Sequence, residues 1–153
     1  MKKKNRREFL STSAKGLGLF VAGGSMIQFL NACSKDENPV SSEPKSFSID
    51  ISDSKYSALQ NIGGTIALSA SDLSGLPDNG IFLIRTSNTE ITVLSRTCSH
   101  QACQVGPFNG SIATCPCHGS AFNTTGAAVK GPATGSLRKY NSTLSGNMLT
   151  FTI

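Results

Sequence analysis

Two short segments rich in cysteine and histidine constrain this chain more than any other part of its sequence. Residues 98–103 read CSHQAC and residues 115–120 read CPCHGS. Together they contain both histidines of the protein and four of its five cysteines. Thiolate and imidazole groups at such close spacing are typical ligands of zinc and of iron–sulfur clusters. We therefore expect residues 98–122 to hold a metal centre, which the rest of the fold presents.

The spacing of the two segments bears on which metal they bind. A C-x-H pair, Cys98 and His100, is followed after fourteen residues by a C-x-x-H pair, Cys115 and His118. A tetrahedral zinc site is one alternative, although zinc motifs usually pair cysteine with cysteine and histidine with histidine at wider spacing. A framework of cysteines joined only in disulfides is another, and it leaves both histidines unexplained. Two cysteines with two histidines are the ligand set of a Rieske [2Fe–2S] centre.

Both segments resemble the cluster-binding boxes of Rieske iron–sulfur proteins, specifically the disulfide-bearing kind found in quinol–cytochrome c reductases. The resemblance implies one [2Fe–2S] cluster with four ligands: Cys98, His100, Cys115 and His118. The cysteines would hold the inner iron and the histidines the outer iron, which changes oxidation state. The resemblance also implies a disulfide between Cys103 and Cys117, which would join the two ligand loops.

Four further residues are interpreted through the same resemblance. Gly131-Pro132 resembles the proline loop that covers the cluster in this family. Ser120 matches a serine that donates a hydrogen bond to cluster sulfur in high-potential relatives. Phe122 stands where those relatives have a tyrosine, so one hydrogen-bond donor is missing. We therefore expect a lower redox potential, which suits a menaquinol-type donor better than ubiquinol.

The net positive charge of the chain comes entirely from its first 32 residues. The whole net charge of +5 arises before residue 33, and the remainder carries eight basic and eight acidic residues. The charge therefore predicts no nucleic-acid partner. A basic start followed by the apolar stretch 16–30 has the layout of an export signal. Residues 5–10, NRREFL, resemble the twin-arginine motif, which is an address read by a receptor.

The apolar stretch ends in residues 30–33, LNAC, which resemble the lipobox of bacterial lipoproteins. Cleavage before Cys33 would leave this cysteine for acylation. An uncleaved anchor is the alternative, but a stretch of fifteen residues forms only ~22 Å of helix against a hydrocarbon core of ~30 Å. Residues 34–46 are polar and are expected to form a flexible tether. The sequence thus predicts a lipoprotein exported by the twin-arginine route, held at the membrane through Cys33 and facing the periplasm.

The predicted organisation is a signal segment at 1–32, a lipidated cysteine with its tether at 33–46, and a Rieske domain at 47–153. No stretch of this last domain sustains helical periodicity, and we expect it to be all-β. Residues 47–51 alternate between apolar and polar, the continuously apolar run 81–84 predicts a central strand paired with 91–94, and residues 149–153 alternate again. The resemblance implies stacked antiparallel sheets with a small cluster-binding subdomain.

A further turn signal lies between the two boxes. Asn109-Gly110 is the strongest two-residue hairpin signal in the chain. A hairpin here would fold residues 112–114 back and bring both ligand loops to one end of the domain.

Two functions remain open at this point. The first is a respiratory subunit that takes electrons from quinol at a cytochrome b-type subunit and carries them to a cytochrome c acceptor. The second is a free-standing periplasmic carrier, or the small Rieske subunit of a molybdenum oxidoreductase of the arsenite oxidase type. The Cys103/Cys117 pair and the proline loop favour the first, whereas Phe122 and the missing membrane-spanning anchor favour the second. As a subunit of an oxidoreductase or as a separate carrier, the chain is expected to transfer electrons rather than to act as a catalyst on its own.

Overall fold

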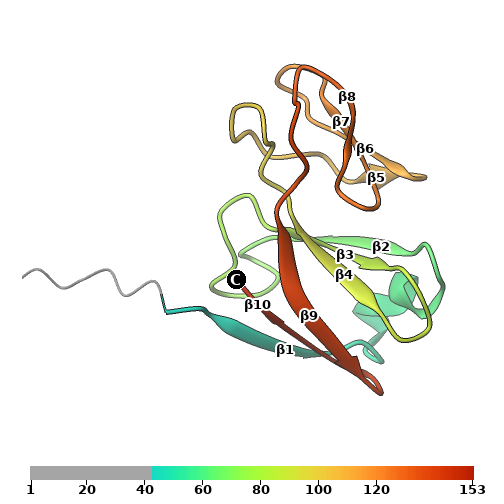
Figure 1. Ribbon diagram of the computed structural model, residues 1–153. Coiled ribbons are helices and arrows are strands. Elements are labelled where there is room, and N and C mark those ends of the chain that lie inside the picture. Colours follow the sequence, from blue (N-terminus) through green and yellow to red (C-terminus); the bar gives the residue numbers. More distant parts are fainter. Residues whose placement is uncertain (1–42) are drawn as a thin grey trace, which may run out of the picture. The chain divides into compact units, whose positions relative to one another are not determined.

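The computed structural model describes residues 43–153, which form ten strands in two antiparallel sheets and one short 3₁₀ helix (Figure 1). The predicted signal, Cys33 and most of the tether lie outside these residues. The all-β prediction with stacked antiparallel sheets is confirmed. Within the described range, no helix has the length and the apolar character that crossing a membrane requires.

The larger sheet has six strands in the order β1-β10-β9-β4-β3-β2. Its strands are β1 (Ser46–Asp50), β2 (Thr65–Leu68), β3 (Ile81–Arg85), β4 (Ile91–Ser95), β9 (Lys139–Ser145) and β10 (Met148–Thr152). The smaller sheet has four strands in the order β5-β6-β7-β8 and lies above the larger one in Figure 1. Its strands are β5 (Phe108–Asn109), β6 (Ile112–Thr114), β7 (Ala121–Asn123) and β8 (Ala128–Lys130).

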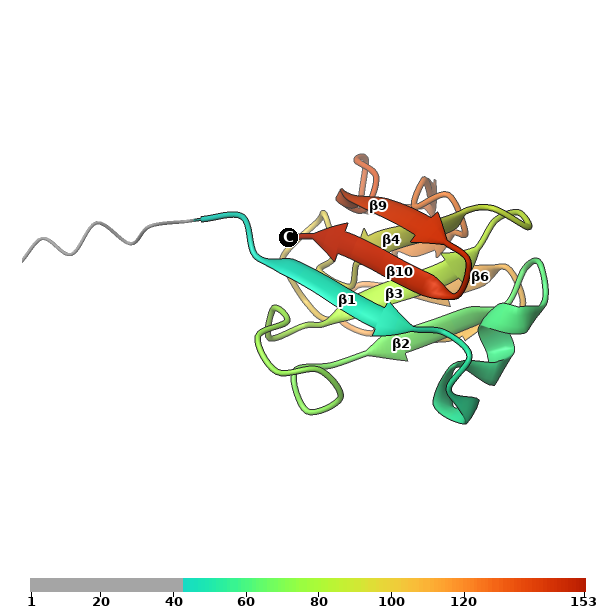
Figure 2. The same cartoon turned by 90° about the horizontal axis from the view of Figure 1, so that it is seen from below.

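The first core lies between the two halves of the six-stranded sheet. Phe47 and Ile49 of β1 are buried while their strand neighbours are exposed, as the alternation predicted. Figure 2 shows β1 and β10 crossing in front of β3 and β4. Side chains from all four strands belong to one buried apolar cluster, which shows that the sheet curls around it. β1 pairs with β10 over five residues, so the first and last strands of the described chain are neighbours.

β3 and β4 are buried on both faces, which explains why their sequences are almost continuously apolar. Alternate side chains of a strand point to opposite faces of the sheet. Ile81 and Leu83 of β3 lie in the first core, while Phe82 and Ile84 lie in a second core shared with the ligand loops. Each such side chain contributes roughly 1.5–3 kcal/mol when fully buried. The central strand and its partner are therefore confirmed, and they carry the cluster-binding part on their outer face.

The 3₁₀ helix η2 (Ser54–Gln60) was not predicted. It begins after Asp53, whose side chain accepts a hydrogen bond from the amide of Lys55 at 3.1 Å. Tyr56 and Leu59, three residues apart, are both buried. A spacing of three matches the turn of a 3₁₀ helix, but seven residues are too few to give a recognisable periodicity.

Two hairpins have a glycine in their turn. One lies between the two ligand loops, and the other joins the last two strands of the chain. Asn109 pairs with Ile112, so the two-residue loop is Gly110-Ser111, one residue later than an Asn-Gly loop. Gly110 has a φ of 60°, the conformation that a type II′ turn places at its first central residue. The hairpin between the boxes is thus confirmed with a shifted register. A second two-residue turn, Gly146-Asn147, joins β9 to β10.

Candidate metal centre

The two ligand loops, residues 98–103 and 115–120, have the same pattern of backbone hydrogen bonds. In each loop the amide of the first residue donates to the carbonyl of the sixth at 2.8 Å. The amide of the fifth residue donates back to the carbonyl of the first, at 2.9 Å and 3.0 Å. Both fifth residues have positive φ, 55° at Ala102 and 76° at Gly119. Each loop therefore forms a tight knuckle whose first residue is a cysteine.

A disulfide joins the two knuckles, because Cys103 and Cys117 are bonded to each other. This confirms the pairing that the resemblance implied. The rings of His100 and His118 lie 4.9 Å apart between centroids and nearly perpendicular. The structure thus brings the residues of both boxes to one place, although the ligand assignment itself remains a prediction.

The remaining cysteines and the two histidines differ sharply in exposure. Cys98 and Cys115 are free thiols that are 3% and 1% exposed. His100 and His118 are exposed. An arrangement with thiols inside and imidazoles outside can hold one metal ion in the interior and a second at the surface.

The surroundings of Cys115 disfavour the thiolate form that would bind a metal ion. Burial raises the pKa of the Cys115 thiol, and the neighbouring Cys98 raises it further, whereas the amides of Cys117 and His118 that donate to its sulfur oppose the shift. Two adjacent buried thiolates need positive charge beside them, and a bound metal cation would supply it. The sulfurs of Cys103, Cys115 and Cys117 lie within 4.8 Å of one another, but only Cys115 among them is free of the disulfide to act as a thiolate.

A third loop, residues 131–136, is hydrogen-bonded to both knuckles. The amide of Ala133 donates to the Ser120 hydroxyl oxygen at 2.9 Å, and the Ser99 hydroxyl donates to the carbonyl of Gly135 at 2.6 Å. Gly131 and Pro132 of this loop are exposed. The predicted proline loop therefore lies against the ligand loops.

Ser120 has an unused donor at the centre of the site. Its side chain is fully buried and accepts the bond from Ala133, and within residues 43–153 no acceptor takes its hydroxyl proton. A serine hydroxyl has one proton to donate, which here is available to the sulfur of a bound cluster. Phe122 is fully buried in the same apolar cluster as Cys98 and Cys115 and adds no donor. The residues present therefore fit an iron–sulfur group.

Asn79, which no sequence pattern singled out, is hydrogen-bonded to the first ligand loop. Its side-chain amide donates to the carbonyl of Ala102 at 2.8 Å and to the hydroxyl of Thr97 at 3.1 Å. Asn79 lies before β3 in an Asp-Asn-Gly stretch, which looks like an ordinary turn. No spacing rule connects it to a carbonyl 23 residues later.

The model of the Rieske [2Fe–2S] domain matches residues 51–141. The chain belongs to the Rieske family. Its cofactor is one [2Fe–2S] cluster, and the zinc and disulfide-only alternatives are set aside.

Among relatives of this Rieske protein, the cytochrome b6-f complex iron–sulfur subunit of Trichodesmium erythraeum is 44% identical over 61 residues, which cover 39% of this chain and 34% of that one. The cytochrome b6-f complex iron–sulfur subunit 1 of Nostoc is 34% identical over 92 residues, 58% of this chain and 48% of that one. The chain thus spans between a third and a half of the length of these relatives. The solved plasma membrane Rieske protein of Synechocystis PCC 6803 is 30% identical over 57% of this chain and 96% of that one, with a TM-score of 0.44.

Proposed function

We propose that this Rieske protein is a membrane-tethered electron-transfer subunit that takes electrons from quinol and passes them to a cytochrome. The observation that carries the proposal is the contrast between two buried cysteines and two exposed, adjacent histidines at one end of the domain. When bound, the cluster supplies one-electron redox chemistry at a potential above that of all-cysteine clusters.

The proposed roles of the residues follow from their exposure. Cys98 and Cys115 would hold the inner iron as thiolates, and His100 and His118 would hold the outer iron. Because the two imidazoles are exposed, their other ring nitrogens can exchange protons with a quinol or with water. An electron that arrives at this edge can therefore be accompanied by a proton on a ligand imidazole.

The partners and the location belong to the same proposal. The relatives named as cytochrome b6-f subunits support a quinol-oxidising cytochrome b-type partner and a cytochrome acceptor. We propose that twin-arginine export and acylation of Cys33 place the domain on the periplasmic side of a membrane, with the residues before Ser46 as its tether. This attachment keeps the exposed histidines within reach of membrane-bound quinol.

A second candidate is a relay in a molybdenum oxidoreductase of the arsenite oxidase type, or a free-standing carrier. The fully buried Phe122, at the position where high-potential relatives have tyrosine, favours it. The two candidates differ in their electron donor, and this difference can be measured.

Membranes from cells that lack this chain provide the test. We expect them to reduce added cytochrome c from a quinol slowly, with the rate restored by the wild-type chain. Cys33→Ser should not restore it, because that protein would not be held at the membrane. Unchanged quinol-dependent rates, together with loss of a molybdenum-enzyme activity, would replace the first candidate by the second.

The redox potential should depend on residues 120 and 122. Reduction adds a negative charge, so a hydrogen bond donated to the cluster favours the reduced state. Ser120→Ala should lower the midpoint potential by some tens of millivolts, because part of a ~1.5–3 kcal/mol bond is lost and ~1.4 kcal/mol corresponds to ~59 mV. Phe122→Tyr should raise it. Protein-film voltammetry at fixed pH measures both shifts. An unchanged or lower midpoint in Phe122→Tyr with the cluster intact would mean that residue 122 does not face cluster sulfur.

A further inference from the structure

A hollow of about 320 Å³ lies beside the first ligand loop, and six of the seven residues that line it carry a polar side chain. Its walls come from the end of β4, the first ligand loop, the third loop and the start of β9. The polar side chains that line it are Ser95, Thr97, Ser99, Ser136, Arg138 and Tyr140. Cys98 also lines it, and none of its lining residues is acidic. We call it the hydroxyl hollow.

The hydroxyl groups of Ser95 and Thr97, which line the hydroxyl hollow, accept hydrogen bonds but donate none within the described residues. The Ser95 oxygen accepts a hydrogen bond from the amide of Thr97 at 3.0 Å, and the Thr97 oxygen accepts one from Asn79 at 3.1 Å. Both side chains thus have their oxygen engaged as an acceptor, and no acceptor between residues 43 and 153 takes either proton. Ser95 is only 4% exposed, so its donor is held inside the structure. Unused buried donors favour a ligand that accepts hydrogen bonds.

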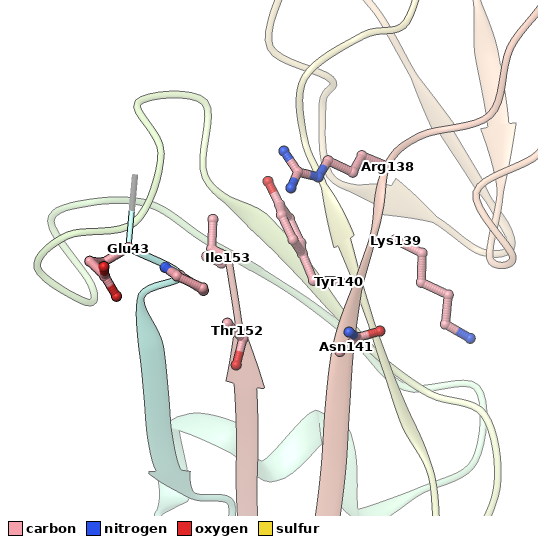
Figure 3. A pocket seen from close by; sticks show the side chains of 8 residues that line it. Glu43, Arg138, Lys139, Tyr140, Asn141, Thr152 and Ile153 are labelled. Atoms are coloured by element: carbon pink, nitrogen blue, oxygen red, sulfur yellow. The ribbon is translucent and has the colours of Figure 1, made fainter. Parts of the chain in front are cut away.

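Arg138 and Tyr140 complete the donor set. The Arg138 guanidinium lies 5.0 Å from the centre of the Tyr140 ring, and Figure 3 shows it close to the tyrosine hydroxyl. Tyr140 is 6% exposed, and its hydroxyl has no hydrogen-bond partner in the described part of the chain. Arg138 forms no ion pair there, whereas its neighbour Lys139 lies 3.5 Å from Glu90. In Figure 3 the Lys139 side chain points away from Arg138.

An adjoining hollow of about 600 Å³, drawn in Figure 3, is also lined by Arg138 and Tyr140. That hollow includes the carboxylate of Glu43 among its lining residues. Lys139 also lines it, but its ammonium group lies 3.5 Å from the carboxylate of Glu90. A carboxylate repels an anion, and the hydroxyl hollow has none. This difference selects the hydroxyl hollow as the place where an anion would bind.

We propose that the hydroxyl hollow binds a small oxyanion, held by the guanidinium of Arg138 and by the hydroxyls of Tyr140, Ser95 and Thr97. Arginine with several hydroxyl donors recognises phosphate and carboxylate groups alike. Because Cys98 lines the same hollow, the anion lies beside a ligand loop whose cluster becomes more negative on reduction. Bound anion therefore favours the oxidised state and lowers the midpoint potential. This redox consequence rests on the proposed electron-transfer function, whereas the binding itself does not.

Titration calorimetry on the oxidised, cluster-loaded protein tests the binding, with inorganic phosphate in one series and acetate in another at constant ionic strength in chloride. Arg138→Gln should weaken binding at least about tenfold, because a charge-assisted bond is lost. Tyr140→Phe, which retains the buried ring, should weaken it by roughly twofold to tenfold. Lys139→Gln is the matched control, since it removes the same charge one residue away and does not line the hydroxyl hollow. It should bind like the wild type.

Voltammetry with the same anions tests the redox consequence. The wild-type midpoint should fall with anion concentration and level off, and a tenfold preference for the oxidised state would appear as a shift of ~59 mV. Arg138→Gln should lose this response and Lys139→Gln should keep it. Stronger binding of phosphate would indicate a free tetrahedral anion, and stronger binding of acetate a carboxylate such as one on a partner protein. Equal weakening in Arg138→Gln and Lys139→Gln, or no binding of either anion, would overturn the proposal. Binding without a change in midpoint would overturn only the redox consequence.

Discussion

Replacement of His118 by alanine is expected to leave the Rieske protein without its cluster. Iron and acid-labile sulfide should both fall from about two per chain to near zero, because a [2Fe–2S] centre with one iron short of a ligand is not retained. The buried Cys98 and Cys115 can hold the inner iron, but the outer iron would keep only His100 at an exposed edge. His100→Ala should have the same result. Metal and sulfide analysis, with the electron paramagnetic resonance signal of the reduced protein, measures the loss.

Gln101→Ala is the control for these variants. Gln101 is exposed and lies beside His100 in the same loop, and its side chain forms no hydrogen bond within the described residues. It should keep full iron and sulfide content. A His118→Ala protein that retained both irons and an unchanged signal would contradict the ligand assignment. Stoichiometric zinc without iron in wild-type protein from its native host would contradict the site as a whole.

Loss of the disulfide should produce the largest change in stability. The bond closes a loop with a sequence separation of 14, and a closed loop of this length restricts the unfolded chain by about 3 kcal/mol in the chain-entropy account. The double variant Cys103→Ser, Cys117→Ser should therefore unfold at a clearly lower temperature, by roughly 10 °C or more. It should also release iron faster, because the two knuckles are no longer covalently joined.

Thermal unfolding followed by circular dichroism, and iron release to a chelator, measure these two effects. Cys33→Ser provides the control, because it removes a cysteine far from the ligand loops in sequence. It should unfold at the wild-type temperature. Treatment of the wild type with a reductant that opens the disulfide should reproduce the double variant. Equal unfolding temperatures for the wild type and the double variant would show that the knuckles are held by their backbone bonds and by packing.

Local patterns predicted the strands whose environment is simple. The run 81–84 is apolar at every position because both faces of β3 are covered, and the alternation at 47–51 reflects a strand with one covered face. Turn glycines predicted the hairpins, although Gly110 took the first loop position and shifted the register. The boxes predicted the Rieske family, because cysteine and histidine at such spacing have few other uses.

Local sequence patterns could not predict the contacts between residues that are far apart in the chain. The pairing of β4 with β9 joins Val93 to Tyr140 across the whole cluster-binding segment, and no local signal specifies it. Asn79 reaches the first ligand loop from a turn before β3, and the hydroxyl hollow assembles side chains from residues 95–140. In each case the chemistry depends on where distant residues meet. The 3₁₀ helix was missed for a different reason, since so short an element has no detectable period.

The pairing of β4 with β9 also gives the cluster-binding part the character of an insertion. The amide of Ser95 donates to the carbonyl of Arg138 at 2.8 Å, so the chain leaves the six-stranded sheet and returns to it at the same point. Segments whose ends abut in this way are the ones most readily removed or transplanted. Residues 96–137 could be replaced by a short turn to give a minimal six-stranded scaffold, provided that Phe82, Ile84 and Leu94 become polar. The same 42-residue cassette could be grafted into another antiparallel pair that offers an apolar outer face.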